Sequence, residues 1–557
     1  MRVKHMRRFV VPLTAAVLAV VMAAPLSAPA QTRGLREIRA ADMRSWLEFL
    51  AAPEFEGRNA PGVTLDIASR YIALEAMKAG LKPLLLEGFL QEVPVEVTTI
   101  SPAKSRLRLL TGNAQEDFFF PQAFGASVRG SSEGAVAAPL VFLGSALSTA
   151  GAEWSKLELP DLRGKIVVLL DVPPPAATPS AEVAQFSSVA RVRFLRDKGA
   201  LGMVTIISPE RETRLAEQGL AFDVPERLRF PDIETGVPGS PPAAAPSPTA
   251  APLPFYQVDV RHDAAAAILG VSHDALEEMF RSAKAGTAVP AHDLEGRTLE
   301  IGLYFETRRT ATPNVVAWLE GRDPVLRKEY VVLGAHHDHL SPRDGRVLPG
   351  ADDNGSGSVA LLSLAKALVV ERPKRSVIFV WHTAEEDGLV GAYYFVQHCP
   401  VPVDKISANL NLDMISRNDP GMIYLIGSNK ISSELDSSIH AANDRSVRMK
   451  LDYTFEDPRH TQRFFFRSDQ FPYIRYGIPG VWFFSGTTAD YHQPTDTVER
   501  ADLAKAEKVT RLVYLVCLDI GNKPALLKLD LDPAITTRGA HNMRIDWRNL
   551  PPKGEKR

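Results

Sequence analysis

The segment YVVLGAHHDH, residues 330–339, joins a short apolar run to three histidines and one aspartate. An apolar run of this length that contains valines is typical of a buried strand. The segment GADDNGSG, residues 350–357, follows with two adjacent aspartates and opens a helical pattern over residues 357–371. Strand, polar loop and helix in this order predict one unit of an α/β sheet.

The same pattern recurs through the second half of the chain. Apolar runs predict further strands at residues 314–319, 376–382, 406–412, 422–426 and 481–484, and helical spacing predicts helices at 433–443 and 501–518. Buried strands that alternate with helices indicate an α/β fold with a mixed, mostly parallel sheet flanked by helices. In such sheets ligands bind at the carboxyl ends of the strands.

Ionisable residues gather at those carboxyl ends. RSVIFVWHTAEED ends in Glu385 and Glu386, ISANLNLDMI carries Asp413, and VWFFSG leads into TTADYHQPTDT with His492. A single such strand end would carry little information, because a lone histidine is usually a packed side chain. Carboxylates and imidazoles that converge from several strands suit zinc or a similar divalent metal. The sequence therefore predicts a metal site at this edge of the sheet.

The motifs GAHHDH, GADDNGSG, TAEED, NLDM and DYHQPTDT, in this order, resemble those of the co-catalytic zinc aminopeptidases. That family includes bacterial leucyl aminopeptidase and, more distantly, glutamate carboxypeptidase, and the resemblance covers about residues 310–518. It implies a zinc-exopeptidase fold of the phosphorylase/hydrolase-like type and two Zn²⁺ ions per chain. It assigns five metal ligands, with Asp353 shared between the two ions: His336, Asp353, Glu386, Asp413 and His492.

The resemblance also implies two catalytic roles. Glu385 matches the general base that takes a proton from a metal-bridging water and hands it to the leaving amine. Asp338 matches the carboxylate that orients His336 through its other ring nitrogen. The implied activity is an exopeptidase, above all an aminopeptidase that hydrolyses the N-terminal residues of peptides.

Other residues near these motifs have no ligand role in the family pattern. We expect His337 and His339 to be bystanders, one of them a surface or supporting group. Asp352 is expected to make local loop hydrogen bonds, Ser468-Asp469 to give structural support, and His382 to be packed.

The chain departs from the leucyl type of the family at one place. A tyrosine that assists the oxyanion in that type is replaced by Phe464, Phe465 and Phe466. Tyr491 is the candidate for oxyanion or substrate support, with Tyr473 as the other hydroxyl considered.

Three alternatives use the same motifs. The site could act as a carboxypeptidase or dipeptidase, it could cyclise N-terminal glutamine with one zinc, or the chain could be a non-enzymatic binding protein. Binding proteins of this fold have lost metal ligands, whereas this chain keeps all five. The complete ligand set therefore favours two metals and hydrolysis.

The first half of the chain has a different texture. DLRGKIVVL, residues 161–169, and VRFLRDKGALGMVTI, residues 192–206, resemble a protease-associated domain, which implies a β-rich insertion. A helix is expected at residues 264–284. The predicted organisation is a signal peptide (1–30), an N-terminal part of the peptidase domain (31–130), the inserted domain (131–295) with a Pro/Ala-rich loop (238–254), the catalytic domain (296–522) and a tail (523–557).

The N-terminus has the features of a signal peptide. Basic residues precede an uncharged apolar run at 10–24, and Ala28-Pro29-Ala30 offers a cleavage site. We therefore expect export to the periplasm or the medium. The two cysteines, Cys399 and Cys517, could pair after export, and the sequence leaves this open.

Composition limits the partners. The 557 residues carry a formal net charge of −2, which gives no electrostatic basis for binding nucleic acid or an anionic membrane. Peptides are the expected substrates, no stable membrane partner is expected, and the oligomeric state is left open.

Overall fold

The computed structural model describes residues 33–148, 154, 157–173, 187–233, 254–287, 289–532, 535 and 537–539. The predicted signal peptide, nearly all of the Pro/Ala-rich loop and the end of the predicted tail lie outside these residues. No helix among the described residues is long and apolar enough to span a membrane. Cys399 and Cys517 are both free thiols, so they do not pair.

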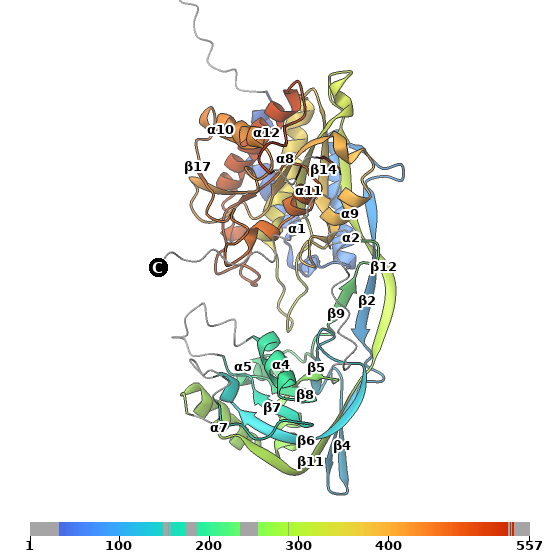
Figure 1. Ribbon diagram of the computed structural model, residues 1–557, viewed down its shortest axis with the longest axis vertical. Helices are drawn as coiled ribbons and strands as arrows, with labels where there is room; N and C mark the ends of the chain where they lie inside the picture. The colour runs from blue at the N-terminus through green and yellow to red at the C-terminus, as the bar shows by residue number, and fades with distance from the viewer. Residues whose placement is uncertain are drawn as a thin grey trace, which may run out of the picture.

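The described chain forms two lobes, each built on its own sheet (Figure 1). The sheet of the larger lobe has the order β17-β16-β18-β15-β13-β14-β12-β2-β9, and β1 pairs with β12. Its strands are β1 (Lys82–Pro83), β2 (Leu90–Ile100), β9 (Glu226–Arg229), β12 (Phe305–Leu319), β13 (Tyr330–His336), β14 (Ser376–His382), β15 (Ile406–Leu412), β16 (Met422–Ile426), β17 (Lys450–Asp452) and β18 (Gly480–Phe484).

Four adjacent strands at the centre of this sheet, β14, β13, β15 and β18, run parallel. Every residue of β14, β15 and β18 is buried, as expected for strands covered on both faces. β12 and β2 continue the sheet in antiparallel fashion beyond β14. The predicted α/β class with a mixed sheet is therefore confirmed. Among the described strands of this sheet, four pairs are parallel and five are antiparallel, so the parallel part is its centre and not most of it.

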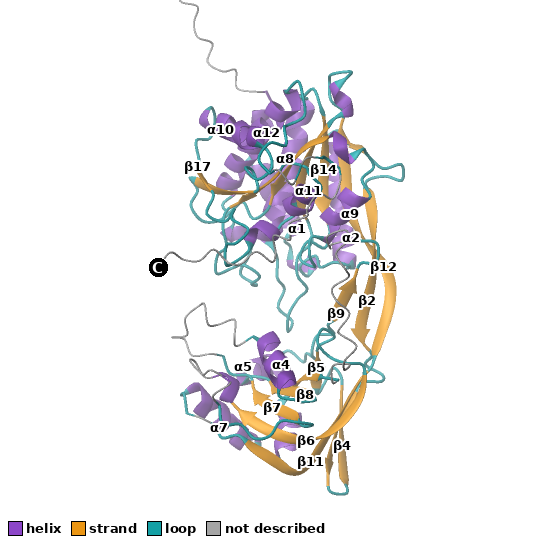
Figure 2. Ribbon diagram, viewed as in Figure 1, coloured by secondary structure: helices purple, strands orange, loops and turns teal. Residues whose placement is uncertain are grey.

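Helices cover both faces of the larger sheet (Figure 2). Alternate strand residues point to opposite faces, so Val331 and Leu333 join one core while Val332 joins the other. The first core is packed by α1 (Ala40–Leu50), α2 (Val63–Lys78), α8 (Gly357–Val370), α10 (Ser433–Asp444) and α12 (Leu503–Asn522). The second is packed by α9 (Val390–Gln397) and α11 (Gln470–Arg475).

The smaller lobe holds an eight-stranded sheet of order β4-β3-β11-β6-β7-β8-β10-β5. Its strands are β3 (Arg106–Thr111), β4 (Ala114–Phe119), β5 (Phe124–Ala126), β6 (Gly134–Gly144), β7 (Ile166–Leu170), β8 (Gly202–Ile206), β10 (Tyr256–Val260) and β11 (His292–Leu303). Its helices are α4 (Ser188–Asp197), α5 (Pro209–Glu217), α6 (His262–Leu269) and α7 (His273–Lys284).

Two sequence expectations differ from this lobe. Along the chain, the first strand of its sheet is β3 and the last is β11, so the lobe extends beyond both boundaries predicted at residues 131 and 295. The helix expected at 264–284 is two helices, because Gly270 ends α6 with a left-handed backbone (φ 72°) that a glycine adopts without strain.

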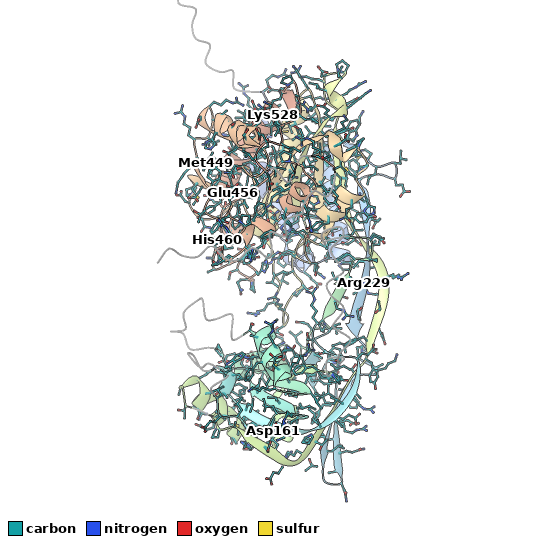
Figure 3. The ribbon with its side chains drawn as sticks, in the orientation of Figure 1. Asp161, Arg229, Met449, Glu456, His460 and Lys528 are labelled. Atoms are coloured by element: carbon teal, nitrogen blue, oxygen red, sulfur yellow. The ribbon has the colours of Figure 1, made fainter. Side chains whose placement is uncertain are left out.

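A long ribbon joins the lobes. β2 and β12 pair from Leu90 to Ile100 and run side by side from the larger lobe toward the smaller one (Figure 1). β9 adds a third strand, and its Arg229 lies on this ribbon, where it pairs with Glu96 at 2.7 Å (Figure 3). The ribbon sets how the small lobe lies below the carboxyl edge of the large sheet.

Candidate metal centre

The predicted ligands lie where four neighbouring strands end. His336 is the last residue of β13, Asp413 directly follows β15, and Glu386 follows β14 after a short turn. His492 lies in the loop after β18. Because these strands are parallel and adjacent, their carboxyl ends place all four side chains at one edge.

One cluster forms around His336. Its Nε2 atom lies 3.3 Å from Asp413 Oδ1 and 3.4 Å from Asp353 Oδ1. All three side chains are buried, and each offers a ligand atom within 4.8 Å of the others.

A second cluster forms around Glu386. His492 Nε2 lies 3.1 Å from Asp353 Oδ2 and 3.2 Å from Glu386 Oε2. His339, for which we expected no ligand role, also enters this cluster, with Nδ1 at 2.9 Å from Glu386 Oε1.

Asp353 belongs to both clusters through its two carboxylate oxygens. Oδ1 faces His336, whereas Oδ2 faces His492. The π-helical turn Ala351–Ser356 carries it, and the backbone N–H groups of Asp352 and Asp353 each donate to Asp496 at 3.1 Å. This arrangement is the one that a carboxylate bridging two cations requires.

The Asp338 carboxylate lies closer to the backbone N–H groups of the two glutamates than to the ring of His336. It lies 3.6 Å from His336 Nδ1, whose hydrogen-bond partner is instead the Asp338 main-chain oxygen at 3.2 Å. The carboxylate accepts from the backbone N–H groups of Glu385 at 3.1 Å and Glu386 at 3.4 Å. Asp338 therefore links the loop of the first histidine to the turn that carries both glutamates.

Glu385 lies beside the first cluster, with its Oε2 atom 3.9 Å from His336 Nε2. Burial raises the pKa of Glu385 well above its usual range, and the negative charges of Glu386, Asp469 and Asp413 add to this effect against the attraction of His336. A carboxylate with a raised pKa is suited to accept a proton and release it again.

The charges of the shared carboxylate and its histidine are coupled. Burial alone would raise the pKa of Asp353, but contacts with His336 and His492 outweigh it and lower that pKa. Burial would lower the pKa of His492, yet Asp353 and Glu386 raise it to about 9. The site therefore favours positive charge at its centre.

Two of the other motif histidines are packed. His337 Nε2 lies 2.7 Å from Ser69 Oγ, and its Nδ1 lies 2.8 Å from the His382 main-chain oxygen. His382 is buried in β14 with Nε2 3.3 Å from Tyr473 Oη, in agreement with the packed role predicted for it. We expected one of His337 and His339 to be a surface or supporting group; both are buried, so the surface alternative is wrong.

Ser468 and Asp352 support the clusters. Ser468 Oγ donates to Asp413 Oδ2 at 2.6 Å and accepts from Asn411 Nδ2 at 2.8 Å. Asp352 Oδ1 accepts from both the N–H and the hydroxyl of Ser416. The contacts of Ser468 fit the supporting role predicted for it. The Asp352 carboxylate bonds to a residue 64 positions away, so its hydrogen bonds are not the local loop contacts that we expected.

Tyr491 stands beside the second cluster. Its ring stacks on His492 with centroids 3.7 Å apart, and its hydroxyl accepts from Arg467 Nη2 at 2.9 Å. Phe464–Phe466 form a short helical turn, of which Phe464 packs under the Arg467 guanidinium at 5.0 Å.

Two hollows adjoin the clusters. A small pocket is lined by Asp353, Glu385, Glu386 and Asp413 together with an apolar set and its rim: Met414, Phe464, Arg467, Trp482, Phe484, Thr487 and Tyr491. A larger cleft of about 630 Å³ lies on the other side of Glu386, between residues 59–62 and 339–343 of the large lobe and residues 223–226.

Two residues with a clear role were missed in the sequence. Arg58, in the loop FEGRNAPG, is buried and donates to the main-chain oxygens of His337, Leu50, Pro349 and Gly350. Asp496, in the PTDT end of the last motif, anchors the Asp353 turn. An arginine inside a glycine- and proline-rich loop and an acid four residues after His492 were the available signals.

The donor set fits a divalent metal. His339 Nδ1 and Nε2, His492 Nε2 and Glu386 Oε1 are buried and have no hydrogen-bond partner among the described residues. Buried polar atoms are nearly always paired, so atoms left unpaired at one point indicate a missing partner. Imidazole nitrogens and carboxylate oxygens are the ligands that zinc takes in proteins.

Comparison with known proteins finds a family model that matches this part of the chain. Residues 314–517, which include every predicted site residue, match the model of peptidase family M28. A probable leucine aminopeptidase 2 from Aspergillus oryzae is 30% identical over 223 residues, 40% of this chain and 41% of the relative. Leucine aminopeptidase 2 from Trichophyton rubrum is 31% identical over 198 residues, 34% and 36% of the two chains. The chain thus matches less than half the length of these relatives.

Two solved structures share the fold over most of the chain. An aminopeptidase from Aneurinibacillus sp. strain AM-1 has a TM-score of 0.50 at 19% identity, covering 90% of this chain and 98% of that one. The zinc aminopeptidase BSAP from Bacillus subtilis has a TM-score of 0.51 at 17% identity, with the same coverage. The likeness therefore extends beyond the matched region to the two-lobed chain.

Proposed function

From the match of residues 314–517 to the model of peptidase family M28, we propose that the chain is an exported, zinc-dependent aminopeptidase that removes N-terminal residues from peptides. The observation that carries the proposal is the pair of clusters that share Asp353, one oxygen facing each. Two donor clusters joined by one carboxylate support a two-metal hydrolytic site.

The proposed ligands divide between two zinc ions. His336 and Asp413 would hold one, Glu386 and His492 the other, and Asp353 both. When bound, the two ions would polarise the scissile carbonyl and lower the pKa of the attacking water. The relatives named as leucine aminopeptidases and the zinc aminopeptidase of like fold support this assignment.

Glu385 is the proposed general base. It takes a proton from the attacking water and delivers it to the amine that leaves when the peptide bond breaks. Its raised pKa supports this role, because the protonated form must last until the leaving group accepts the proton. The hydrogen bond from the Glu385 backbone N–H to Asp338 fixes the main chain from which this side chain extends.

The small pocket supports an apolar N-terminal residue as the preferred substrate. Met414, Phe464, Trp482 and Phe484 line it directly beside the carboxylates. An apolar side chain placed there would be removed from water, which contributes about 1.5–3 kcal/mol for a leucine-sized group.

The test uses the purified mature chain. We expect hydrolysis of leucyl reporter substrates, loss of activity with a chelator, recovery with zinc and two zinc ions per chain by elemental analysis. N-acetylated leucyl substrates should be poor, because the free amine is blocked. Activity that survives complete metal removal would overturn the proposal. A content of one zinc per chain would instead favour glutaminyl cyclisation, and no hydrolysis of any peptide would favour a binding protein.

One observation favours a second candidate, a carboxypeptidase or dipeptidase. Arg467 is exposed at the rim of the pocket, and among the described residues it forms no ion pair with an acid. A guanidinium in this position is suited to bind a substrate carboxylate. Cleavage of N-acetylated peptides with a free C-terminus, lost in Arg467→Met, would support this candidate over the aminopeptidase.

We also propose that the smaller lobe limits the size of the substrate. The cleft beside Glu386 is lined by the large lobe and by residues 223–226, where the chain passes from α5 of the smaller lobe into β9 of the large sheet. Cleavage of a peptide length series should therefore fall off steeply with length.

We propose further that the chain is exported. N-terminal sequencing of the protein from the cell exterior or periplasm should start at Gln31, and an intact Met1 would contradict export by cleavage.

A further inference from the structure

Among the motif histidines, His339 has contacts that its expected bystander role does not explain. We propose that His339 is a fourth protein donor at the second metal position, beside Asp353, Glu386 and His492. This inference rests on the proposed metal site, and it reverses the expectation that His339 has no part in it.

The geometry places His339 inside the cluster. Its Nδ1 lies 2.9 Å from Glu386 Oε1 and 3.9 Å from Asp353 Oδ2. His339, Asp353 and Glu386 together offer three ligand atoms within 4.8 Å of one another. The His339 ring is 2% exposed and its centroid lies 5.6 Å from that of His492. His339, Asp353, Glu386 and His492 thus converge on one point from four different segments of the chain.

The short contact with Glu386 is not a hydrogen bond. A distance of 2.9 Å would suit one, yet neither His339 Nδ1 nor Glu386 Oε1 has a partner of hydrogen-bond geometry among the described residues. His492 Nε2 shows the same pattern toward Asp353 and Glu386. Donor atoms that lie side by side without pointing at one another are arranged as ligands of a common ion are.

An ion pair between His339 and Glu386 explains the contacts less well. A charged imidazole carries N–H groups on both nitrogens, and both His339 nitrogens are buried without a partner. Burying unpaired N–H groups costs about 1–3 kcal/mol each. A neutral ring that gives its Nδ1 lone pair to a metal leaves one N–H group unpaired. His337, in contrast, has a partner at each nitrogen.

The consequence is that the two metal positions differ. The first would have three protein donors, His336, Asp353 and Asp413, and would keep a place for water or substrate. The second would have four, the number with which structural zinc sites are closed. We therefore expect the second position to retain its metal longer under a competing chelator than the first.

The experiment compares His339→Asn with His337→Asn, a matched change at the neighbouring buried histidine. The parent should bind two zinc ions with unequal affinity in a competition titration. His339→Asn should weaken the tighter ion by more than about tenfold, a loss already seen when only an outer partner of a ligand is removed. His337→Asn should keep both affinities, and circular dichroism should show that both variants are folded.

Cobalt substitution separates a ligand from a neighbour. In the Co²⁺-loaded parent, proton spectra should show three exchangeable, paramagnetically shifted imidazole N–H signals, from His336, His339 and His492, and His339→Asn should show two. Two signals in the parent, or parental zinc affinities in His339→Asn, would overturn the inference while leaving the two-metal peptidase intact. A parent that binds no metal would overturn the proposed function as well.

Discussion

The guanidinium of Arg58 donates to the main-chain oxygen of His337 at 3.0 Å and thereby ties the N-terminal helices to the loop that follows β13. The same group donates to the oxygens of Pro349 and Gly350, at the start of the turn that carries Asp353. One buried side chain thus holds both ligand loops. Burial lowers the pKa of Arg58 to about 10, opposed by the nearby carboxylates, so the group stays charged at neutral pH.

Replacing this group should destabilise the protein. Arg58→Met leaves four main-chain oxygens without their donor, and we expect the free energy of unfolding to fall by about 3–5 kcal/mol. Urea denaturation of the metal-free protein measures this directly. Arg44→Met removes an exposed arginine, 3.9 Å from Glu48, and should change stability by less than about 0.5 kcal/mol. Equal stabilities of parent and Arg58→Met would refute the structural role.

Much of the fold could be predicted from the sequence, because its buried strands are short apolar runs between polar turns. β14, β15 and β16 have the predicted bounds because each is a short, mostly buried apolar run between polar turns. The first half of β12 was missed, because FETRRTA lies on an exposed ribbon and has no core-facing pattern. The reach of the small sheet also escaped prediction, since β3 and β11 pair across almost two hundred residues.

The place of the site could be predicted from the pattern of strand ends, whereas its ligands were assigned through the resemblance to the zinc aminopeptidases. His336, Asp353 and Asp413 each sit at a strand end or in the turn before a helix, where that pattern places the site. The places of Arg58 and His339 depend on where distant loops meet, 279 residues apart for Arg58 and His337. Composition around His339 gives no sign of such contacts, and the signal at Arg58 is an arginine inside a glycine- and proline-rich loop.

The adjacent residues Glu385 and Glu386 should have different functions. Glu385→Gln should lower kcat by about 10²–10⁴-fold, the size of a general-base contribution, while zinc content stays at the parental value. Glu386→Gln should lose zinc, because it removes a donor from the second cluster. Elemental analysis with steady-state kinetics on a leucyl substrate tests both. Loss of zinc in Glu385→Gln, or a kcat near that of the parent, would contradict the assignment.

Tyr491 should affect turnover more than binding. Arg467 donates to its oxygen, so the phenolic hydrogen is free to point elsewhere, toward the oxygen of a bound substrate. We expect Tyr491→Phe to lower kcat by about 10²-fold, as for loss of one oxyanion donor, with little change in KM. Tyr473→Phe is the matched control, because that hydroxyl is buried against His382. Equal losses in both variants would point to a structural effect.

Asp344 links the lobes next to the site. It lies in the loop that follows His339 and accepts from Arg211 at 3.0 Å and Arg214 at 2.8 Å, both on α5 of the smaller lobe. Burial alone would raise the pKa of Asp344, but the hydrogen bonds and charges of Arg211 and Arg214 outweigh it and lower that pKa. The folded state therefore binds this proton less readily than the unfolded chain.

The sign of the pH dependence follows. A carboxylate whose pKa is lowered by folding contributes stability that is full above its unfolded value, about 3.9, and is lost as the pH falls through the folded value. Asp344→Asn should lower the free energy of unfolding by about 1–2 kcal/mol at pH 7 and pH 5. The difference from the parent should shrink below about pH 4, because the unfolded chain takes up a proton at this residue more readily than the folded parent does. Asp263→Asn, at an exposed carboxylate, controls for the loss of charge. A difference that grows on acidification, or none at pH 7, would show that this contact does not hold the lobes together.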